Sequence, residues 1–123
     1  MIEKIISGGQ TGVDSAALDV AIRHKIPYAG WVPKRRLADD GTIPSKYKLH
    51  EMPTASYSKA TEQNVIDSDG TLIVSHGQLN GEFAFTMKKA IQHTRSFLHT
   101  DLNKAHIYDA SVLILNWLRE NDI

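Results

Sequence analysis

Two glycine-rich loops contain the residue types that proteins use to hold a phosphate. The first is Gly8-Gly9-Gln10-Thr11-Gly12, and the second begins at Ser75 and Gly77 and reaches Gly81. Glycine lets backbone N–H groups approach an anion closely, and a loop that opens a helix presents N–H groups without helical partners. Both loops are therefore candidate phosphate cradles. The alternative for each is an ordinary tight turn, with Thr11 capping the helix after the first loop.

Other polar residues could complete such a site. Lys34-Arg35-Arg36 is the one tight basic cluster, and Lys34 and Arg36 would supply counter-charge to a phosphate. Because Asp39 and Asp40 follow closely, a solvated run that pairs with these carboxylates is the alternative. Thr61 and Asn64 share one face of a predicted short helix, where they could orient a ligand or simply face solvent.

Several kinds of catalytic site are disfavoured by the sequence. The first loop matches neither G-x-G-x-x-G nor a P-loop, which argues against a standard dinucleotide site or an ATPase. The chain has no cysteine, which excludes disulfides and thiolate nucleophiles, and its six histidines show no metal-ligand spacing. We therefore expect no metal held by the protein itself. No G-x-S-x-G elbow is present, which disfavours a serine hydrolase.

The charge balance bears on partners and location. Lys plus Arg and Asp plus Glu number 14 each, so there is no global field to attract nucleic acid, and we expect no nucleic-acid partner. No long apolar segment follows a basic start, so we expect neither a signal peptide nor a membrane span. The expected location is the cytoplasm.

Short β-branched segments alternate with helical apolar stripes along the 123 residues. This order predicts an α/β fold with a mostly parallel sheet, in a single domain over residues 1–123. Strands are expected at 4–7, 28–32, 71–75 and 97–102, helices at 13–26, 59–67, 83–94 and 107–118, and an irregular loop at 33–56. We expect Ser58 to cap the second helix. A loop of that length in a compact domain is usually functional.

Motifs over nearly the whole chain together resemble one known family. They are Ser7–Asp14, Gly30–Lys34, Asp40-Gly41, Ile43-Pro44, Thr61–Val65 and Asp67–Ile73. They look like the putative molybdenum-carrier family, a circularly permuted branch of the Rossmann-like group that includes the lysine decarboxylase-like phosphoribohydrolases. The resemblance implies a Rossmann-like three-layer sandwich, usually in a homo-oligomer. It also implies binding of the molybdenum cofactor (molybdopterin), a pterin with a terminal phosphate, or of a related nucleotide-like ligand.

The ligand-binding positions carried over from the family lie on both glycine loops and around them. They are Gly8, Gly9, Gln10, Thr11, Gly12, Lys34, Arg36, Thr61, Asn64, Asp69, Ser75, Gly77 and Gly81. The chain also departs from the family. Ala60 replaces a usual Arg, Glu82 stands where a second glycine is usual, and the family continues past Ile123 with a further strand, so we expect that edge strand to be lacking here.

The leading hypothesis is a carrier that holds its anionic ligand without transforming it. The main alternative is an N-glycosidic hydrolase acting on a nucleotide, as in the related phosphoribohydrolases. No Glu stands three residues after Thr86, where those enzymes have their catalytic Glu, so Glu62 and His76 would be the acid–base candidates. A nucleotide-sensing domain would use the same pocket and stays open as a third possibility.

Overall fold

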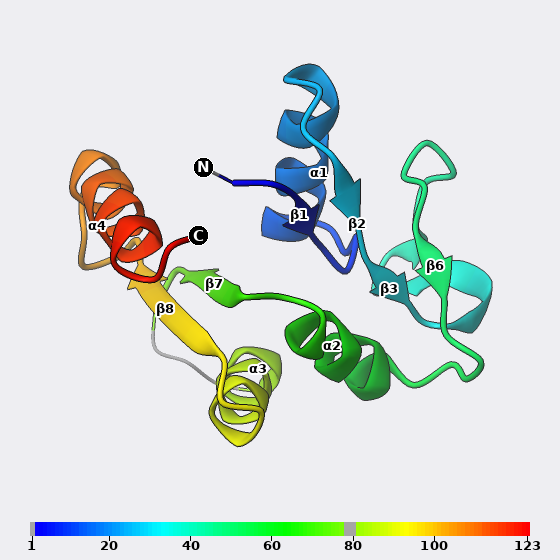
Figure 1. Ribbon diagram of the computed structural model, residues 1–123. Helices are drawn as coiled ribbons and strands as arrows, with labels where there is room; N and C mark the ends of the chain where they lie inside the picture. Colours follow the sequence, from blue (N-terminus) through cyan, green and yellow to red (C-terminus); the bar gives the residue numbers. More distant parts are fainter. Residues whose placement is uncertain (1, 78–80) are drawn as a thin grey trace. The chain divides into compact units, whose positions relative to one another are not determined.

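The structure, a computed structural model, describes residues 2–77 and 81–123, which form two compact units at 2–67 and 68–123. Strands and helices alternate in each unit (Figure 1). In chain order they are β1 (Ile5–Ile6), α1 (Val13–Arg23), β2 (Tyr28–Ala29), β3 (Trp31–Val32), η1 (Lys34–Arg36), β4 (Leu37–Ala38), β5 (Gly41–Thr42), β6 (His50–Glu51), α2 (Tyr57–Ile66), β7 (Gly70–Ser75), α3 (Gly81–Gln92), β8 (Ser96–Asp101) and α4 (Ile107–Glu120). This alternation confirms the predicted α/β class.

The strand expected at 28–32 is divided in two by Gly30. Its first half, β2, pairs in parallel with β1, and its second half, β3, pairs in parallel with β6. A Cβ atom at Gly30 would lie 1.9 Å from the carbonyl oxygen of Ser7. The backbone at Ser7, just after β1, therefore approaches this position more closely than any other residue type allows, and Gly30 is required where the two strand pairs meet.

The segment expected to be an irregular loop, 33–56, contains regular structure. It holds η1, the antiparallel β4–β5 hairpin and β6. Ile43 and Tyr47 from this segment are 3% exposed and pack with Leu18 and Val32 in the core of residues 2–67. The prediction of an irregular loop was wrong because Ile43 and Tyr47 are buried by contacts with distant parts of the chain. Such contacts produce no periodic pattern in the local sequence.

Two helix starts differ from the expected ones. The hydroxyl oxygen of Ser56, not of Ser58, accepts a hydrogen bond of 3.2 Å from the N–H of Lys59 and caps α2. Gly12 occupies the N-cap position of α1, and no side chain caps that helix. Thr11 is therefore not the cap, and no side chain accepts a hydrogen bond from the N–H groups at the start of α1.

In residues 68–123, β7 and β8 pair in parallel over six residues each, from Gly70 opposite Ser96 to Ser75 opposite Asp101. Helices α3 and α4 lie on either side of this pair (Figure 1). The indole N–H of Trp117 on α4 donates to the Ser96 hydroxyl at 3.0 Å. A Cβ at Gly70 would lie 2.9 Å from the same ring, so the absence of a side chain at Gly70 leaves room for the indole. None of the helices in the described residues is long and apolar enough to cross a membrane.

Candidate functional site

The first glycine loop has a backbone path that its glycines make possible. Gly9 and Gly12 have φ values of +71° and +93°, a region that residues with a side chain seldom adopt. A Cβ at Gly9 would lie 2.9 Å from Leu49 Cδ1 and 3.1 Å from Ile43 Cγ2, whereas nothing lies within 4 Å of that position at Gly12. Gly9 is therefore constrained by both conformation and packing, and Gly12 by conformation only.

The loop leaves a run of backbone donors at the start of α1. The Gly9 N–H donates to the Ser7 hydroxyl at 3.2 Å, and that hydroxyl donates to the Asp14 carbonyl at 2.9 Å. In residues 2–77 and 81–123, the N–H groups of the next four residues, Gln10–Val13, donate no hydrogen bond. The free donors thus run over Gln10–Val13, from the second half of the glycine loop into the first residue of α1.

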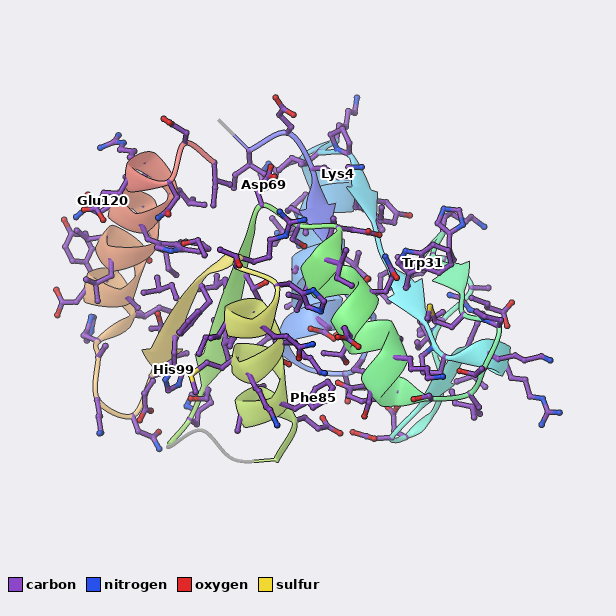
Figure 2. The ribbon with its side chains drawn as sticks, turned by 60° about the horizontal axis from the view of Figure 1, so that its bottom comes forward. Lys4, Trp31, Asp69, Phe85, His99 and Glu120 are labelled. Atoms are coloured by element: carbon purple, nitrogen blue, oxygen red, sulfur yellow. The ribbon has the colours of Figure 1, made fainter. Side chains whose placement is uncertain are left out.

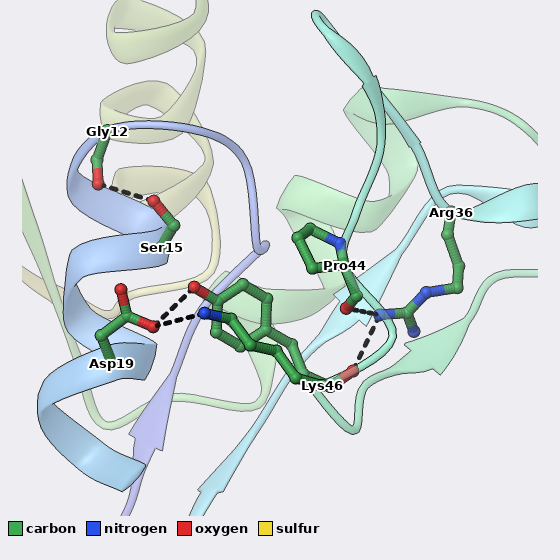
Figure 3. Close-up of polar contacts among 7 residues, drawn as sticks. Gly12, Ser15, Asp19, Arg36, Pro44 and Lys46 are labelled. Atoms are coloured by element: carbon green, nitrogen blue, oxygen red, sulfur yellow. Dashed lines mark hydrogen bonds and ion pairs between the residues drawn. The ribbon is translucent and has the colours of Figure 1, made fainter. Parts of the chain in front are cut away.

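Two carbonyl groups of the same loop, those of Gln10 and Gly12, accept hydrogen bonds. The Ser15 N–H donates to the Gln10 carbonyl at 3.0 Å, and the Ala16 N–H donates to the Gly12 carbonyl at 3.0 Å. The Ser15 hydroxyl also donates to the Gly12 carbonyl at 3.1 Å (Figure 3). Because these two acceptors are engaged while the N–H groups of Gln10–Val13 donate no bond within the described residues, the loop presents the positive end of the helix dipole, which suits an anion.

The Gln10 side chain holds the β4–β5 hairpin rather than a ligand. Its amide nitrogen donates to the Leu37 carbonyl at 3.2 Å, and its amide oxygen accepts from the Asp39 N–H at 3.3 Å. Gln10 is 7% exposed. Only its backbone N–H is left for binding, and the side chain serves to join the glycine loop to the hairpin that follows the basic cluster.

The two predicted cations have different surroundings. The Arg36 guanidinium donates to the carbonyls of Pro44 and Tyr47 at 2.8 Å (Figure 3). It also donates to the Ile43 carbonyl at 3.2 Å. It thereby fixes the segment that carries the buried Ile43 and Tyr47. Lys34 is exposed, and in the described part of the chain neither Asp39 nor Asp40 forms an ion pair with the cluster. The positive charge available to a ligand is therefore that of Lys34 more than that of Arg36.

Asn64 joins α2 to β3 beside the glycine loop. Its amide oxygen accepts from the Trp31 N–H at 2.7 Å, and its amide nitrogen donates to the Trp31 carbonyl at 3.0 Å. A Cβ at Gly8 would lie 3.6 Å from the same nitrogen and 3.1 Å from Asp14 Oδ2. The structure thus brings Gly8, Asp14 and Asn64 together. Thr61 lies one helical turn before Asn64 and is half-buried.

Trp31, labelled in Figure 2, is held in place by α2. Its indole N–H donates to Asp67 Oδ2 at 2.9 Å, and Gln63 donates to the other oxygen of Asp67 at 2.9 Å. The ring lies 5.4 Å from that of His50, centre to centre. The tryptophan therefore fixes the end of α2 against β3.

The second predicted loop is held by side chains of its own unit, 68–123. The Ser75 hydroxyl donates to the Gly77 carbonyl at 2.8 Å and lies 2.7 Å from His99 Nε2. Asp101 accepts hydrogen bonds from the N–H groups of Gly77 at 2.8 Å and Asn103 at 2.9 Å. These two donors hold the pKa of the Asp101 carboxyl below its ordinary value. The described start of this loop is thus fixed by the protein itself.

His99 and Asp101 were not among the residues expected at the second loop. Opposite residues of a parallel pair share a face, and alternate residues along each strand share it too, so Ser75, His99 and Asp101 lie on one face of β7–β8. His99 is labelled on β8 in Figure 2. Two polar residues at alternate positions near the end of this strand, His99 and Asp101, were the available signal.

The remaining predicted positions have simpler surroundings. Asp69 is exposed in the turn before β7, and Gly81 begins α3 with a φ of +47°. Glu62 is half-buried on α2, and His76 is exposed just after β7. The middle of the second loop, 78–80, lies outside the described residues. In the described residues no three His, Asp or Glu side chains gather as metal ligands would.

The chain belongs to the circularly permutated YpsA SLOG family, whose model matches residues 5–123. It is similar to the crystal structure of a putative molybdenum carrier protein from Syntrophus aciditrophicus SB. The two chains are 58% identical with a TM-score of 0.97, over 99% of this chain and 77% of that one. No curated protein matches the chain. These findings confirm the resemblance found in the sequence and the Rossmann-like fold.

Proposed function

We propose that this chain binds and carries a phosphate-bearing small molecule at the loop that opens α1. The observation that supports this most is the run of unused backbone N–H groups over Gln10–Val13. Four adjacent donors at the amino terminus of an 11-residue helix suit the oxygens of one phosphate group. The similar Syntrophus protein is named a putative molybdenum carrier. The cargo proposed for this chain is molybdenum cofactor, whose terminal phosphate is the group that these donors would hold.

Other residues of the same unit would complete this site. Lys34, which forms no ion pair within the described residues, supplies a positive charge in the segment that leads into the hairpin held by Gln10. Gly8 leaves room beside Asn64, whose amide is oriented by the Trp31 backbone. Arg36 contributes by shaping the loop, because its guanidinium is directed to three backbone carbonyls. A carrier needs no more chemistry than this set of donors.

The test removes one donor while keeping the helix. Val13 is the first residue of α1, and its side chain is 48% exposed. Proline is well tolerated at this helix position but has no N–H. Val13→Pro should therefore weaken cofactor retention about tenfold or more, as expected for one hydrogen bond to a charged group, ~1.5–3 kcal/mol. Val13→Ala keeps the N–H and is the matched control.

The measurement uses purified protein incubated with molybdenum cofactor and, separately, with a nucleoside monophosphate. Retained cofactor is oxidised to its fluorescent pterin and quantified, and free base released from the nucleotide is followed by chromatography. Equal retention by the proline and alanine variants would argue against the loop as the site. Base release that Glu62→Gln abolishes, with no cofactor retained, would establish the hydrolase in place of the carrier.

A further inference from the structure

The 43–49 segment packs against the first glycine loop. A Cβ at Gly9 would lie 3.1 Å from Ile43 Cγ2 and 2.9 Å from Leu49 Cδ1, so both ends of the segment meet the backbone of Gly9. This contact lies directly before Gln10–Val13, whose N–H groups donate no hydrogen bond in residues 2–77 and 81–123. The 43–49 segment therefore holds the loop at the residue where the run of free donors begins.

The same segment is attached to α1 through Tyr47. This residue is 3% exposed, and its hydroxyl donates to Asp19 Oδ1 at 2.6 Å, a contact drawn in Figure 3. Asp19 comes six residues after Val13, the first residue of α1, and so lies about 9 Å further along the helix axis. The hydrogen bond to Asp19 raises the pKa of the Tyr47 phenol, and burial adds to this. Tyr47 therefore keeps the proton that it donates at neutral pH.

We propose that the Tyr47–Asp19 hydrogen bond positions the phosphate-binding donors, so that Tyr47 and Asp19 are positioning residues of the site. This role rests on the function proposed above. The N–H groups of Gln10–Val13 lie between the two attachments of the 43–49 segment, with Gly9 before them and Asp19 after them. The two attachments together fix the loop relative to the helix that it opens. Without the bond to Asp19, the segment and Gly9 would shift together, and the four N–H groups would no longer converge on one phosphate.

Other contacts of the 43–49 segment supply the controls. The Lys46 ammonium lies 3.7 Å from Asp19 Oδ1, but both side chains are more than half exposed, so this ion pair should add little. The Tyr28 hydroxyl on β2 accepts a hydrogen bond from the Lys48 N–H at 3.2 Å. Tyr28 thus ties the segment to β2 and not to α1, and phenylalanine removes its hydroxyl as it does that of Tyr47.

The test compares Tyr47→Phe with Tyr28→Phe in the retention assay and in amide hydrogen exchange without ligand. The Ser15 N–H donates to the Gln10 carbonyl at 3.0 Å, so its exchange rate reports how firmly the loop is held on α1. Tyr47→Phe should speed this exchange and weaken cofactor retention about tenfold each, as expected for one hydrogen bond to a charged group. Tyr28→Phe should leave both nearly unchanged. Thermal unfolding measures the stability that each variant loses, and a merely structural role would make retention follow that loss.

Substitutions of Asp19 test the other side of the bond. Asp19→Asn keeps an oxygen that accepts from Tyr47 and should retain cofactor better than Asp19→Ala, while Lys46→Ala should retain it as the wild type does.

Equal retention by Tyr47→Phe and Tyr28→Phe would overturn the positioning role, even where Val13→Pro weakens retention and so upholds the site. Equal retention by Val13→Pro and Val13→Ala would instead overturn the proposed function. In that case faster Ser15 exchange in Tyr47→Phe alone would still uphold the link between the 43–49 segment and the loop, and unchanged exchange would refute it.

Discussion

The two glycine-rich loops have similar sequences and similar positions after a strand, yet they differ in what their N–H groups do. After β1, only the Gly9 N–H is bonded within the loop, and those of Gln10–Val13 stay unused in the described chain. After β7, the N–H of Gly77 is bound by the Asp101 carboxylate. Glycine content therefore shows where the backbone can turn, while neighbouring side chains decide whether its donors remain available.

This difference bears on which of the two loops can bind an anion. The carboxylate of Asp101 already supplies a negative charge to the second loop, so an anionic ligand would have to compete with it there. In the first loop, the neutral hydroxyl of Ser7 takes one donor and leaves the next four. For this reason the proposed phosphate site is placed at the first loop alone.

The largest expected effect comes from adding one methyl group to each loop. Gly9→Ala combines a positive φ with a Cβ that would lie 2.9 Å from Leu49, and it should lower the free energy of unfolding by about 2–4 kcal/mol. Gly77→Ala also has a positive φ, but its nearest contact would be 3.7 Å away at Asn103. It should cost about 1–3 kcal/mol from strain alone. Urea unfolding measures both values.

An equal loss in the two variants would mean that packing around Gly9 adds nothing to its conformational strain. Gly12→Ala refines the comparison within the first loop, because its φ is positive but nothing lies within 4 Å of its added methyl group. Its loss of stability should resemble that of Gly77→Ala more than that of Gly9→Ala.

The next effect separates the two predicted cations. Arg36→Ala leaves three backbone carbonyls without their donor, and it should lower the stability of the protein by about 1–3 kcal/mol. Lys34→Ala should leave the melting temperature nearly unchanged and weaken cofactor retention severalfold. Thermal unfolding and the retention assay, run on both variants, check this division. If Lys34→Ala retains cofactor as the wild type does, the basic cluster takes no part in binding.

The sequence predicted the strand–helix order and the glycine loop that opens α1, because β-branched runs, helical stripes and glycines are local signals. It could not predict the hydrogen bonds that decide the role of each residue. Arg36 and Lys34 are equivalent cations in the sequence. Only the folded position of residues 43–47 shows that the Arg36 guanidinium already donates to backbone carbonyls.

The errors in helix starts and in residues 33–56 have the same origin. Ser56 and Ser58 are equivalent as local capping signals, and only the path of the chain into α2 distinguishes them. Ile43 and Tyr47 become core residues by meeting Leu18, which lies more than twenty residues earlier in the chain. Such contacts leave no periodic pattern in the sequence, so a long segment without periodicity was mistaken for an irregular loop.

The smallest expected effect concerns the carboxylate that binds the N–H of Gly77. The Gly77 and Asn103 N–H groups lower the pKa of Asp101 in the folded state, so the ionised carboxylate is better stabilised there than in the unfolded chain. Its contribution to stability is therefore fully present above the unfolded pKa, near 3.8, and is lost as pH falls through the lower folded value.

Asp101→Asn should reduce the melting temperature at neutral pH, and the gap between the melting temperatures of the variant and the wild type should narrow below about pH 4. Thermal unfolding from pH 7 down to pH 3 measures that gap, with Asp69→Asn as the control because Asp69 is an exposed carboxylate outside these bonds. A gap that stays constant over this range would show that the charge of Asp101 does not hold the second loop, and the contrast between the two loops would then rest on geometry alone.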